Sequence, residues 1–389
     1  MYDFVLFENF HLAYNHYKDI CIIAKMLVAS GYSVAIADVY DEAKQCIING
    51  IPHIPIKVPK PVIRKSGNIP VLRVLENHVQ TRKRWKYLTK VVEELIPICR
   101  NIYAGSYHVG LSLDMIKAIP ADKNIFFWGL RSSRLYEYKL HKDWNSWNCY
   151  RVSRYVKSHN NVKLFVSDEL IKQEFQQLGV NCNRLVIRPE RTIDKLATKG
   201  TERATKHQHN CLKLLSIGTL RPQKRIETVL SAIKHIEVFP IEYTIAGKAD
   251  DSYECIIQEA MIGVEKVFRK NYRLSEEEFN QLIDNCDFLI LCDKKSCSNV
   301  TNGTLNEALL RGRPIIAPSH EPYKSIVGNN GVGILFEDGV QESICEAIMR
   351  AFNKGSNAFM DSIINYQKTF YFPSVVERFR IDMKQCIGV

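Results

Sequence analysis

Residues 287–318 read DFLILCDKKSCSNVTNGTLNEALLRGRPIIAP, and this stretch decides the fold. It begins with an apolar run, Asp287–Leu291, passes through a polar loop of mostly small residues, and enters a helix running to about Arg311. Gly312 ends that helix, and Arg313–Ala317 is a second apolar run of strand length. A strand, a helix and another strand in this order indicate a βαβ unit, in which the two strands are parallel.

The same alternation continues on both sides of this unit. In the second half, further strands are predicted at Lys213–Ile217, Tyr243–Ala246, Val264–Phe268 and Gly333–Phe336, and one intervening helix opens with a capping box, Ser275–Glu278. In the first half, the predicted elements are a helix at His16–Ser30 and strands at Asp3–Glu8, Ser33–Val39, Asn101–Ala104, Ile125–Trp128, Lys163–Ser167 and Leu185–Arg188. The sequence therefore predicts an α/β protein with two doubly wound, Rossmann-like sheets.

A polar segment separates the two halves. Residues 196–210, LATKGTERATKHQHN, have few apolar side chains and no periodicity, so we interpret them as an interdomain linker. We expect an N-terminal domain at 1–195, a C-terminal domain at 211–365 and a C-terminal helix at 366–389. Open parallel sheets bind ligands outside the carboxyl ends of their strands, so two such domains would offer two half-sites across one cleft.

Composition excludes several classes of protein. With 46% apolar and 24% charged residues, the chain is neither disordered nor collagen-like. The start, MYDFVLFENF, lacks the features of a signal peptide, and the longest apolar stretch, Ile20–Ala29, is too short to span a bilayer. The 12 cysteines are scattered without any CxxC pair. We expect a cytoplasmic protein with reduced thiols.

Positive charge is concentrated in the first half. Residues 1–200 carry 30 Lys and Arg against 18 Asp and Glu, whereas residues 201–389 carry 23 against 24. Within the basic region 57–90 and just after it, apolar residues recur at helical spacing: Val79, Trp85, Leu88, Val92 and Leu95. Such a basic amphipathic helix fits an anionic membrane surface, a nucleic acid, or a solvated face over an ordinary core helix. We favour the membrane surface and, without a nucleic-acid-binding signature, expect no nucleic acid.

Two polar segments that follow predicted strands are candidates for binding an anion. The first, IGTLRPQKR at 217–225, places Gly218 where backbone can approach a ligand and sets Lys224 and Arg225 at the next helix start. The second places the amides of Asn302, Gly303 and Thr304 at a helix N-terminus, where they would face an anion.

In this order and spacing, the second half resembles the nucleotide-sugar-binding domain of the retaining glycosyltransferases of family 4, which have the GT-B fold. The resemblance covers 211–352 and rests on GTLRPQKR, LSEEEFNQLIDNCDFLIL, NVTNGTLNEALLRGRPIIAP and GILFEDGVQESICEAI. The first half is similar more loosely, and the tail resembles the helix that crosses back to the first domain in that family. The resemblance implies sugar transfer from a nucleotide-diphosphate sugar to a glycan or lipid-linked acceptor in polysaccharide, capsule or lipopolysaccharide synthesis, with retention and without metal or other cofactor.

The resemblance also implies roles for individual residues on the donor side. Lys224 matches the lysine that contacts the donor pyrophosphate, and Glu307 matches the glutamate that holds the donor ribose. Gly303 and Thr304 fall in the loop whose amides face the phosphates.

This sequence departs from the family at two donor positions. Asn299 stands where a first glutamate contacts the donor sugar, although an amide also hydrogen-bonds hydroxyls. Thr219 stands where a basic residue is usual, and Arg221 is the candidate to compensate. A catalytically silent GT-B protein, binding nucleotide-sugar or glycan as a partner subunit, is therefore the alternative function.

Candidate acceptor-side residues come from the first half. His11 and His16 flank the first predicted loop, His108 follows a strand, and Arg131 lies just after another strand end. Each is either a cleft residue or an ordinary surface residue. We take His108, with Lys224 and Asn299, as the catalytic candidates, and His11, His16 and Arg131 as acceptor-binding candidates. The residues do not identify the donor base or sugar.

Overall fold

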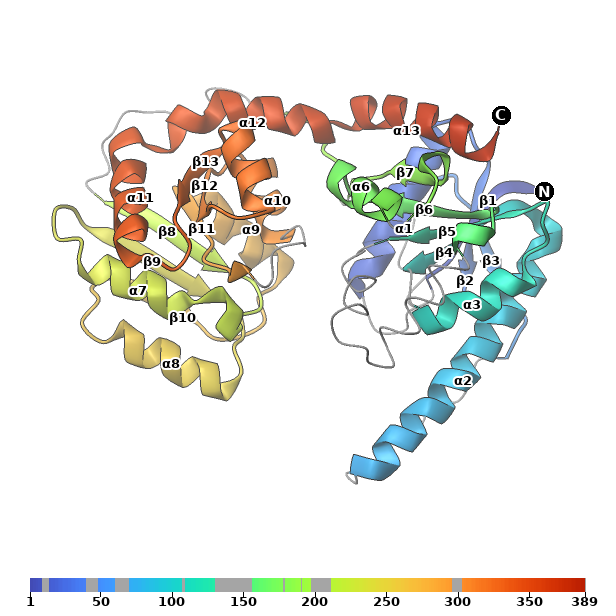
Figure 1. Ribbon diagram of the computed structural model, residues 1–389, viewed down its shortest axis with the longest axis horizontal. Helices are drawn as coiled ribbons and strands as arrows, with labels where there is room; N and C mark the ends of the chain where they lie inside the picture. Colours follow the sequence, from blue (N-terminus) through green and yellow to red (C-terminus); the bar gives the residue numbers. More distant parts are fainter. Residues whose placement is uncertain are drawn as a thin grey trace. The chain divides into compact units, whose positions relative to one another are not determined.

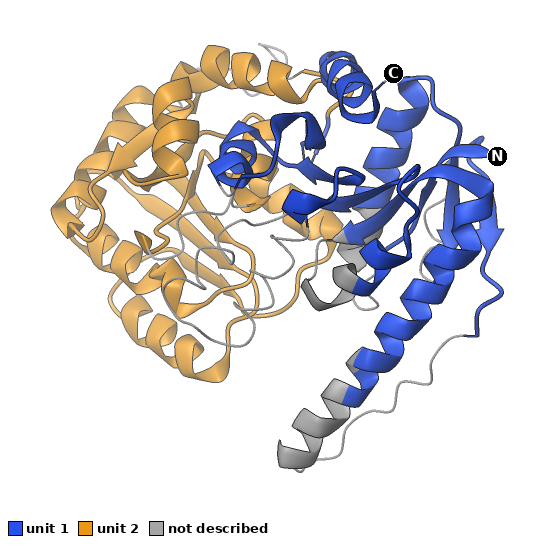
Figure 2. Ribbon diagram, turned by 45° about the vertical axis from the view of Figure 1, so that its right-hand side comes forward, with its two compact units in different colours: residues 1–192, 372–389 blue, residues 193–371 orange. Residues whose placement is uncertain are grey.

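The structure is a computed structural model that describes residues 1–8, 14–39, 48–59, 70–106, 109–129, 156–177, 179–189, 191–196, 211–295 and 303–388 (Figure 1). The chain separates into two compact units (Figure 2). Unit 1 consists of residues 1–192 and 372–389, and unit 2 consists of residues 193–371.

Unit 1 is built on a parallel sheet whose seven described strands have the order β3-β2-β1-β4-β5-β6-β7. The strands are β1 (Tyr2–Leu6), β2 (Val34–Asp38), β3 (His53–Pro55), β4 (Cys99–Ser106), β5 (Asn124–Trp128), β6 (Val162–Val166) and β7 (Leu185–Ile187). The helices are α1 (Tyr14–Ala29), α2 (Pro70–Leu95), α3 (Val109–Ala118), α6 (Glu169–Gln177) and α13 (Phe372–Ile387), with short 3-10 turns at Ile96–Ile98 and Cys182–Arg184.

The two faces of this sheet are covered by different helices. Side chains of a strand point alternately to opposite faces, so Phe4 and Leu6 of β1 join one apolar cluster and Val5 joins the other. The first cluster includes side chains of α1 and α13, and the second includes side chains of α2, α3 and α6. Burial on both faces explains why the strands read as continuous apolar runs.

Unit 2 has a second parallel sheet, with the order β10-β9-β8-β11-β12-β13. The strands are β8 (Leu212–Ile217), β9 (Ile241–Ala246), β10 (Val267–Lys270), β11 (Phe288–Ile290), β12 (Ile315–Pro318) and β13 (Gly333–Phe336). The helices are α7 (Ile226–Lys234), α8 (Asp251–Met261), α9 (Glu276–Asn285), α10 (Gly303–Leu310), α11 (Gln341–Lys354) and α12 (Met360–Gln367). Shorter helical turns lie at Pro222–Lys224, Lys324–Gly328, Ser356–Phe359 and Lys368–Phe370.

The first and last residues of unit 2 pair with each other through their backbones. Ile193 and Tyr371 form a parallel bridge, and the amide of Ile193 donates to the carbonyl of Phe370 at 2.9 Å. After Tyr371 the chain enters α13, whose buried residues include Val375, Phe379 and Met383. α13 therefore completes the core of unit 1 although it is the last element of the chain.

Several local predictions from the sequence need correction. β3 was not predicted, and β10 begins at Val267 rather than at Val264. On α2, Leu88 is buried as expected, but Val79 is 52% exposed and lies off the apolar face. Most of the expected linker, residues 197–210, lies outside the described residues.

The capping box at the start of α9 is only half formed. The Ser275 hydroxyl accepts a hydrogen bond from the Glu278 amide at 3.1 Å, as predicted. The Glu278 carboxylate instead accepts from Lys270 Nζ at 2.9 Å and from the Tyr272 hydroxyl at 2.6 Å. These two donors lower the pKa of Glu278, with the Tyr272 hydrogen bond the larger cause.

The cysteines differ from the expectation at one position. Cys21 of α1 is disulfide-bonded, so the prediction of reduced thiols is wrong for this residue. The other cysteines in the described ranges are free: Cys99, Cys182, Cys211, Cys255, Cys286, Cys292, Cys345 and Cys386. Among the described helices, none combines the length and apolar character needed to cross a membrane.

Candidate functional site

The candidate donor site lies where the strands of unit 2 end. Gly218 follows β8 directly, with a φ of +112° that favours glycine. A Cβ atom placed on Gly218 would lie 3.3 Å from Oγ1 of Thr304, at the beginning of α10. The fold therefore brings together the two polar segments that the sequence singled out, at the edge where parallel sheets bind ligands.

A second glycine lies directly against the turn that carries Gly218. Gly247 follows β9 with a φ of +128°, and a Cβ atom there would lie 1.8 Å from the carbonyl oxygen of Gly218. The Gly218 amide in turn donates to the Ala246 carbonyl at 3.0 Å. The turns after β8 and β9 therefore pack backbone against backbone and leave no room for a side chain at Gly247.

Helix α10 presents a polar side beside these turns. Gly303 is exposed, and Thr304 and Glu307 are half-buried. Positions three apart share one side of a helix, so Thr304 and Glu307 lie on the same side. The opposite side is buried through Leu305, Asn306, Ala308 and Leu309. The first amides of α10 have no acceptor within their own helix and provide a partial positive charge.

The turn before α7 carries the candidate phosphate cations. Arg221 is exposed, and Lys224 is half-buried at the end of the Pro222–Lys224 turn. Neither side chain forms an ion pair with any residue in the described ranges. The backbone of this turn is attached to the chain after β11, because the Lys294 amide donates to the Gln223 carbonyl at 2.9 Å.

Arg225 differs from its neighbours because its guanidinium is occupied. Nε donates to the carbonyl of Cys292 at 2.8 Å, Nη2 donates to the carbonyl of Asp293 at 3.3 Å, and Nη2 also pairs with the Asp338 carboxylate. Only 13% of the side chain is exposed. Burial lowers the pKa of Arg225, but Asp338 and other nearby acidic groups outweigh burial and raise the pKa above its ordinary value.

Asp293 is held from a second direction. His320 follows β12 and is buried. Its Nε2 lies 2.9 Å from the Asp293 carbonyl and 4.0 Å from the Asp338 carboxylate. The Tyr323 hydroxyl donates to the Asp293 carboxylate. These contacts connect the chain after β8, β11, β12 and β13 into one polar network.

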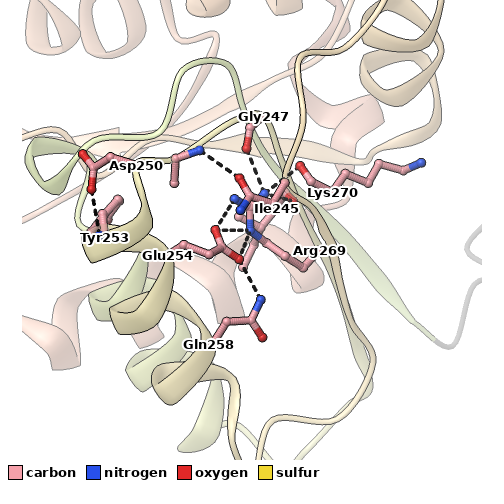
Figure 3. Close-up of polar contacts among 10 residues, drawn as sticks. Ile245, Gly247, Asp250, Tyr253, Glu254, Gln258, Arg269 and Lys270 are labelled. Carbon is pink, nitrogen blue, oxygen red and sulfur yellow. Dashed lines mark hydrogen bonds and ion pairs between the residues drawn. The ribbon is translucent and has the colours of Figure 1, made fainter. Parts of the chain in front are cut away.

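A second arginine fixes the turns after β9 and β10 (Figure 3). Nη1 of Arg269 donates to three backbone carbonyls, those of Ile245 at 3.2 Å, Gly247 at 2.9 Å and Lys270 at 2.7 Å. Its Nε and Nη2 face the carboxylate of Glu254 on α8 (Figure 3). The arginine side chain is 6% exposed, so it supports the edge of the site and is not available to a ligand.

Unit 1 gathers a buried polar cluster at the carboxyl ends of its strands. Arg188 follows β7, lies 3.1 Å from the Asp19 carboxylate of α1 and stacks on the Trp128 ring at 3.6 Å. Glu8, which follows β1, is 1% exposed and packs on Gly105 of β4, where a Cβ atom would lie 2.6 Å from its carboxylate. This cluster was not predicted from the sequence, although charged residues directly after apolar strands were the available signal.

Several predicted site residues lie outside the described ranges. They are His11, His108, Arg131, Asn299 and Asn302. His16 lies on α1, but its side chain is not described. Thr219 is exposed in the turn after Gly218. Arg269 and Asp338 were not predicted as site residues from the sequence. Within the described ranges, no group of three or more His, Cys, Asp and Glu side chains is placed to hold a metal ion.

Solved structures of the same architecture cover nearly the whole chain. One is HepE (Alr3699) of Anabaena in complex with UDP, with 13% identity, a TM-score of 0.65, and coverage of 98% of this chain and 99% of that one. A second is WaaG, a glycosyltransferase involved in lipopolysaccharide biosynthesis, with 13% identity, a TM-score of 0.62 and coverage of 97% and 98%. A third is the lipopolysaccharide outer core galactosyltransferase WaaB, with 15% identity, a TM-score of 0.63 and coverage of 98% of both chains.

These likenesses, with the two parallel-sheet units, define the protein as one of the GT-B class, as the sequence predicted. Residues 200–370 match the family model of glycosyl transferases group 1. This part of the chain, less than half of its length, is therefore similar to glycosyl transferases group 1. No curated protein matches the sequence significantly.

Proposed function

We propose that the protein transfers a sugar from a nucleoside-diphosphate sugar to a glycan or lipid-linked acceptor in cell-surface polysaccharide synthesis. The observation that carries the proposal is the proximity of Gly218 to Thr304, which places the turn bearing Lys224 beside the N-terminus of α10. HepE was solved with UDP and with UDP-glucose, so a uridine donor is the first to test. The titles of WaaG and WaaB support a lipopolysaccharide-type acceptor.

The proposed chemistry needs charge stabilisation at the leaving diphosphate. Negative charge builds on the diphosphate as the sugar–phosphate bond breaks, and preorganised donors aimed at that charge lower the barrier. Lys224 and Arg221 would supply cations, and the Gly303 and Thr304 amides would supply the helix N-terminus. Glu307 would accept hydrogen bonds from the donor ribose. We propose that transfer proceeds with retention and without a metal ion.

A membrane-bound acceptor is consistent with the exposed side of α2. Arg82, Lys83, Lys86 and Lys90 are all exposed on this helix, whereas Leu88 is buried. Basic side chains of this kind are attracted to anionic lipid headgroups. We therefore propose that α2 brings unit 1 to an anionic membrane surface, where a lipid-linked acceptor would be found.

The second candidate function is a catalytically silent protein that binds nucleotide-sugar or glycan as a partner subunit. The observation in its favour is chemical. Thr219 and Asn299 carry no charge at the two positions where related enzymes place a cation and a carboxylate. Such a protein would bind nucleotide but would not turn the donor over.

A nucleotide panel separates these functions. Thermal unfolding is measured with UDP, GDP, ADP and CMP and their common sugar conjugates, without added metal and then with Mg²⁺. Binding to the folded state raises the melting temperature by mass action. Stabilisation by one nucleotide together with hydrolysis of its sugar conjugate supports the transferase. Stabilisation without turnover supports the silent protein, and no stabilisation by any of them contradicts the transferase and leaves a silent protein that binds glycan.

Glu307 provides the sharpest substitution on the donor side. We expect Glu307→Ala to weaken UDP binding at least about tenfold, because a hydrogen bond to a charged group contributes about 1.5–3 kcal/mol. Glu259→Ala, at an exposed position of α8, is the matched control. Equal UDP affinity in the Glu307 and Glu259 variants would rule out the ribose assignment.

A further inference from the structure

Arg225 has an unusual backbone conformation for a residue with a side chain. It lies between the Pro222–Lys224 turn and α7 with φ 45° and ψ 48°, in the left-handed region that glycine adopts more readily. A non-glycine residue persists there only where the surroundings fix it. The contacts of the guanidinium account for this, since they hold the side chain against the chain after β11.

The acceptors of the Arg225 guanidinium belong to the framework of the site. Cys292 and Asp293 follow β11 and begin the segment that leads to α10, and Asp338 follows β13. Asp293 is itself fixed by Tyr323 and His320. The guanidinium is therefore attached to two strand ends that the core of unit 2 holds in place.

We propose that Arg225 is a positioning residue of the donor site, which sets Lys224 at the distance from α10 that a diphosphate requires. This inference rests on the proposed function. Arg225 holds the turn through Cys292, Asp293 and Asp338, and it does not itself contact the donor. The Lys294–Gln223 hydrogen bond attaches the same turn but involves backbone only, so the side-chain attachment is the one that substitution can remove.

The substitution Asp338→Asn distinguishes a positioning role of Arg225 from direct contact with the diphosphate, because the two roles predict different changes in UDP affinity. If Arg225 contacted the diphosphate, Asp338→Asn would remove a nearby negative charge, and anion affinity would rise or stay the same. If Arg225 positions Lys224, Asp338→Asn loosens the guanidinium, and UDP affinity falls. We expect a fall of about tenfold, the size typical for losing one charge-assisted hydrogen bond.

The experiment measures the dissociation constants of UDP and uridine by calorimetry for the full-length wild type and five variants. Arg225→Gly suits the left-handed backbone and removes the guanidinium, whereas Arg225→Lys keeps the charge but cannot reach both attachment points. Lys224→Ala removes the cation itself. Asp284→Asn is the control, because Asp284 pairs with Arg311 at the far end of α10 with the same chemistry.

The inference predicts that Arg225→Gly, Arg225→Lys and Asp338→Asn each weaken UDP binding about tenfold, as Lys224→Ala does, and leave uridine binding unchanged. Asp284→Asn should leave both unchanged. Equal loss of uridine and UDP would mean a general structural role and would overturn the inference. Wild-type affinity for UDP in Arg225→Lys, or tighter binding in Asp338→Asn, would overturn it in favour of direct contact. A wild type that binds none of the nucleotides in the panel would overturn the proposed function as well.

Discussion

Gly247 is the residue at which the candidate site has least room. A Cβ atom there would overlap the Gly218 carbonyl oxygen at 1.8 Å, so Gly247→Ala must displace one of the two turns. We expect a loss of more than about 3 kcal/mol of stability in unit 2, the range of severe core substitutions, and weaker UDP binding. Urea unfolding followed by far-UV circular dichroism gives the stability.

Gly263 is the matched control for this substitution. It also has a positive φ, of +78°, but a Cβ atom there meets nothing within 4 Å. Gly263→Ala should therefore lower the free energy of unfolding by only about 1–2 kcal/mol, the cost of a side chain at positive φ, and leave UDP affinity unchanged. Equal losses for the two variants would mean that the close approach of Gly247 to Gly218 does not constrain the site.

Glu174 of α6 should make the stability of unit 1 depend on pH. Burial, with a smaller contribution from Asp168, raises the pKa of Glu174 from 4.5 to about 7. The folded state therefore binds more protons than the unfolded state between these values. The stability from this group is full below about pH 4.5 and is lost as pH rises through about 7. Glu174→Gln should unfold at a higher temperature than the wild type at pH 8, and this difference should vanish at pH 4.5.

Tryptophan fluorescence reports this effect from unit 1 alone. All four tryptophans, Trp85, Trp128, Trp144 and Trp147, lie in residues 1–192. Glu169→Gln is the control, because Glu169 is an exposed carboxylate on the same helix. If the Glu174 and Glu169 variants shift the transition alike at pH 8, burial does not perturb Glu174.

At the residue scale, the sequence singled out Gly218 and Thr304 as candidate site residues but did not show how the residues around them are held. Gly218 and Thr304 come together because parallel strands end at the same edge, a rule that needs no coordinates. The orientation of Arg225 depends on its left-handed backbone and on carbonyls about 67 residues away, which no local pattern contains. Arg188 and Asp19 are separated by 169 residues, and only the folded sheet of unit 1 with α1 packed on it brings them into contact.

At the scale of elements, α2 is the helix whose role is most open to test. We expect charge reversal of its exposed basic residues, Arg82, Lys83, Lys86 and Lys90, to glutamate to weaken binding to vesicles with 30% anionic lipid. The loss should be at least about tenfold, because each basic residue near an anionic surface contributes ~1 kcal/mol. Sedimentation with vesicles measures the bound fraction. Arg84 is left unchanged because its side chain is half-buried.

The control for α2 has the same change in net charge but lies in unit 2. Lys234, Lys324, Lys354 and Lys368 are exposed on other elements, and their reversal to glutamate lowers the charge of the protein by the same amount. If both sets of substitutions weaken vesicle binding equally, only net charge matters and α2 is not the membrane-binding element.

Most elements followed from sequence periodicity, and the exceptions have physical causes. β3 has three residues, of which none is buried, so it lacks the apolar run that identifies the central strands. The Glu278 side chain does not complete the capping box, because its carboxylate accepts hydrogen bonds from Lys270 and Tyr272, which lie outside α9. Tertiary contacts of this kind override a local signal without changing where the helix begins.

At the scale of the whole molecule, unit 2 is inserted in unit 1. The chain leaves unit 1 after Thr192 and returns at Phe372, and the Ile193–Tyr371 bridge ties the two connections together. Alternation of strands and helices was enough to predict two α/β units. Alternation could not show that α13 shares a core with α1, because that depends on contacts between the two ends of the chain.

Phe379 tests whether α13 stabilises unit 1 independently of unit 2. Its side chain is fully buried, with its ring centroid 5.7 Å from that of Phe165 in β6. Phe379→Ala should cost unit 1 about 3–5 kcal/mol, as large-to-small core substitutions do, and lower the urea midpoint of the tryptophan transition. Arg378→Ala, at the exposed neighbouring position, is the control.

The stabilisation of unit 2 by UDP should persist in the Phe379 variant, because the candidate donor site lies in residues 193–371. If UDP instead raises the urea midpoint of the tryptophan transition as much as it raises the midpoint for unfolding of unit 2, the two units unfold as one and α13 supports both.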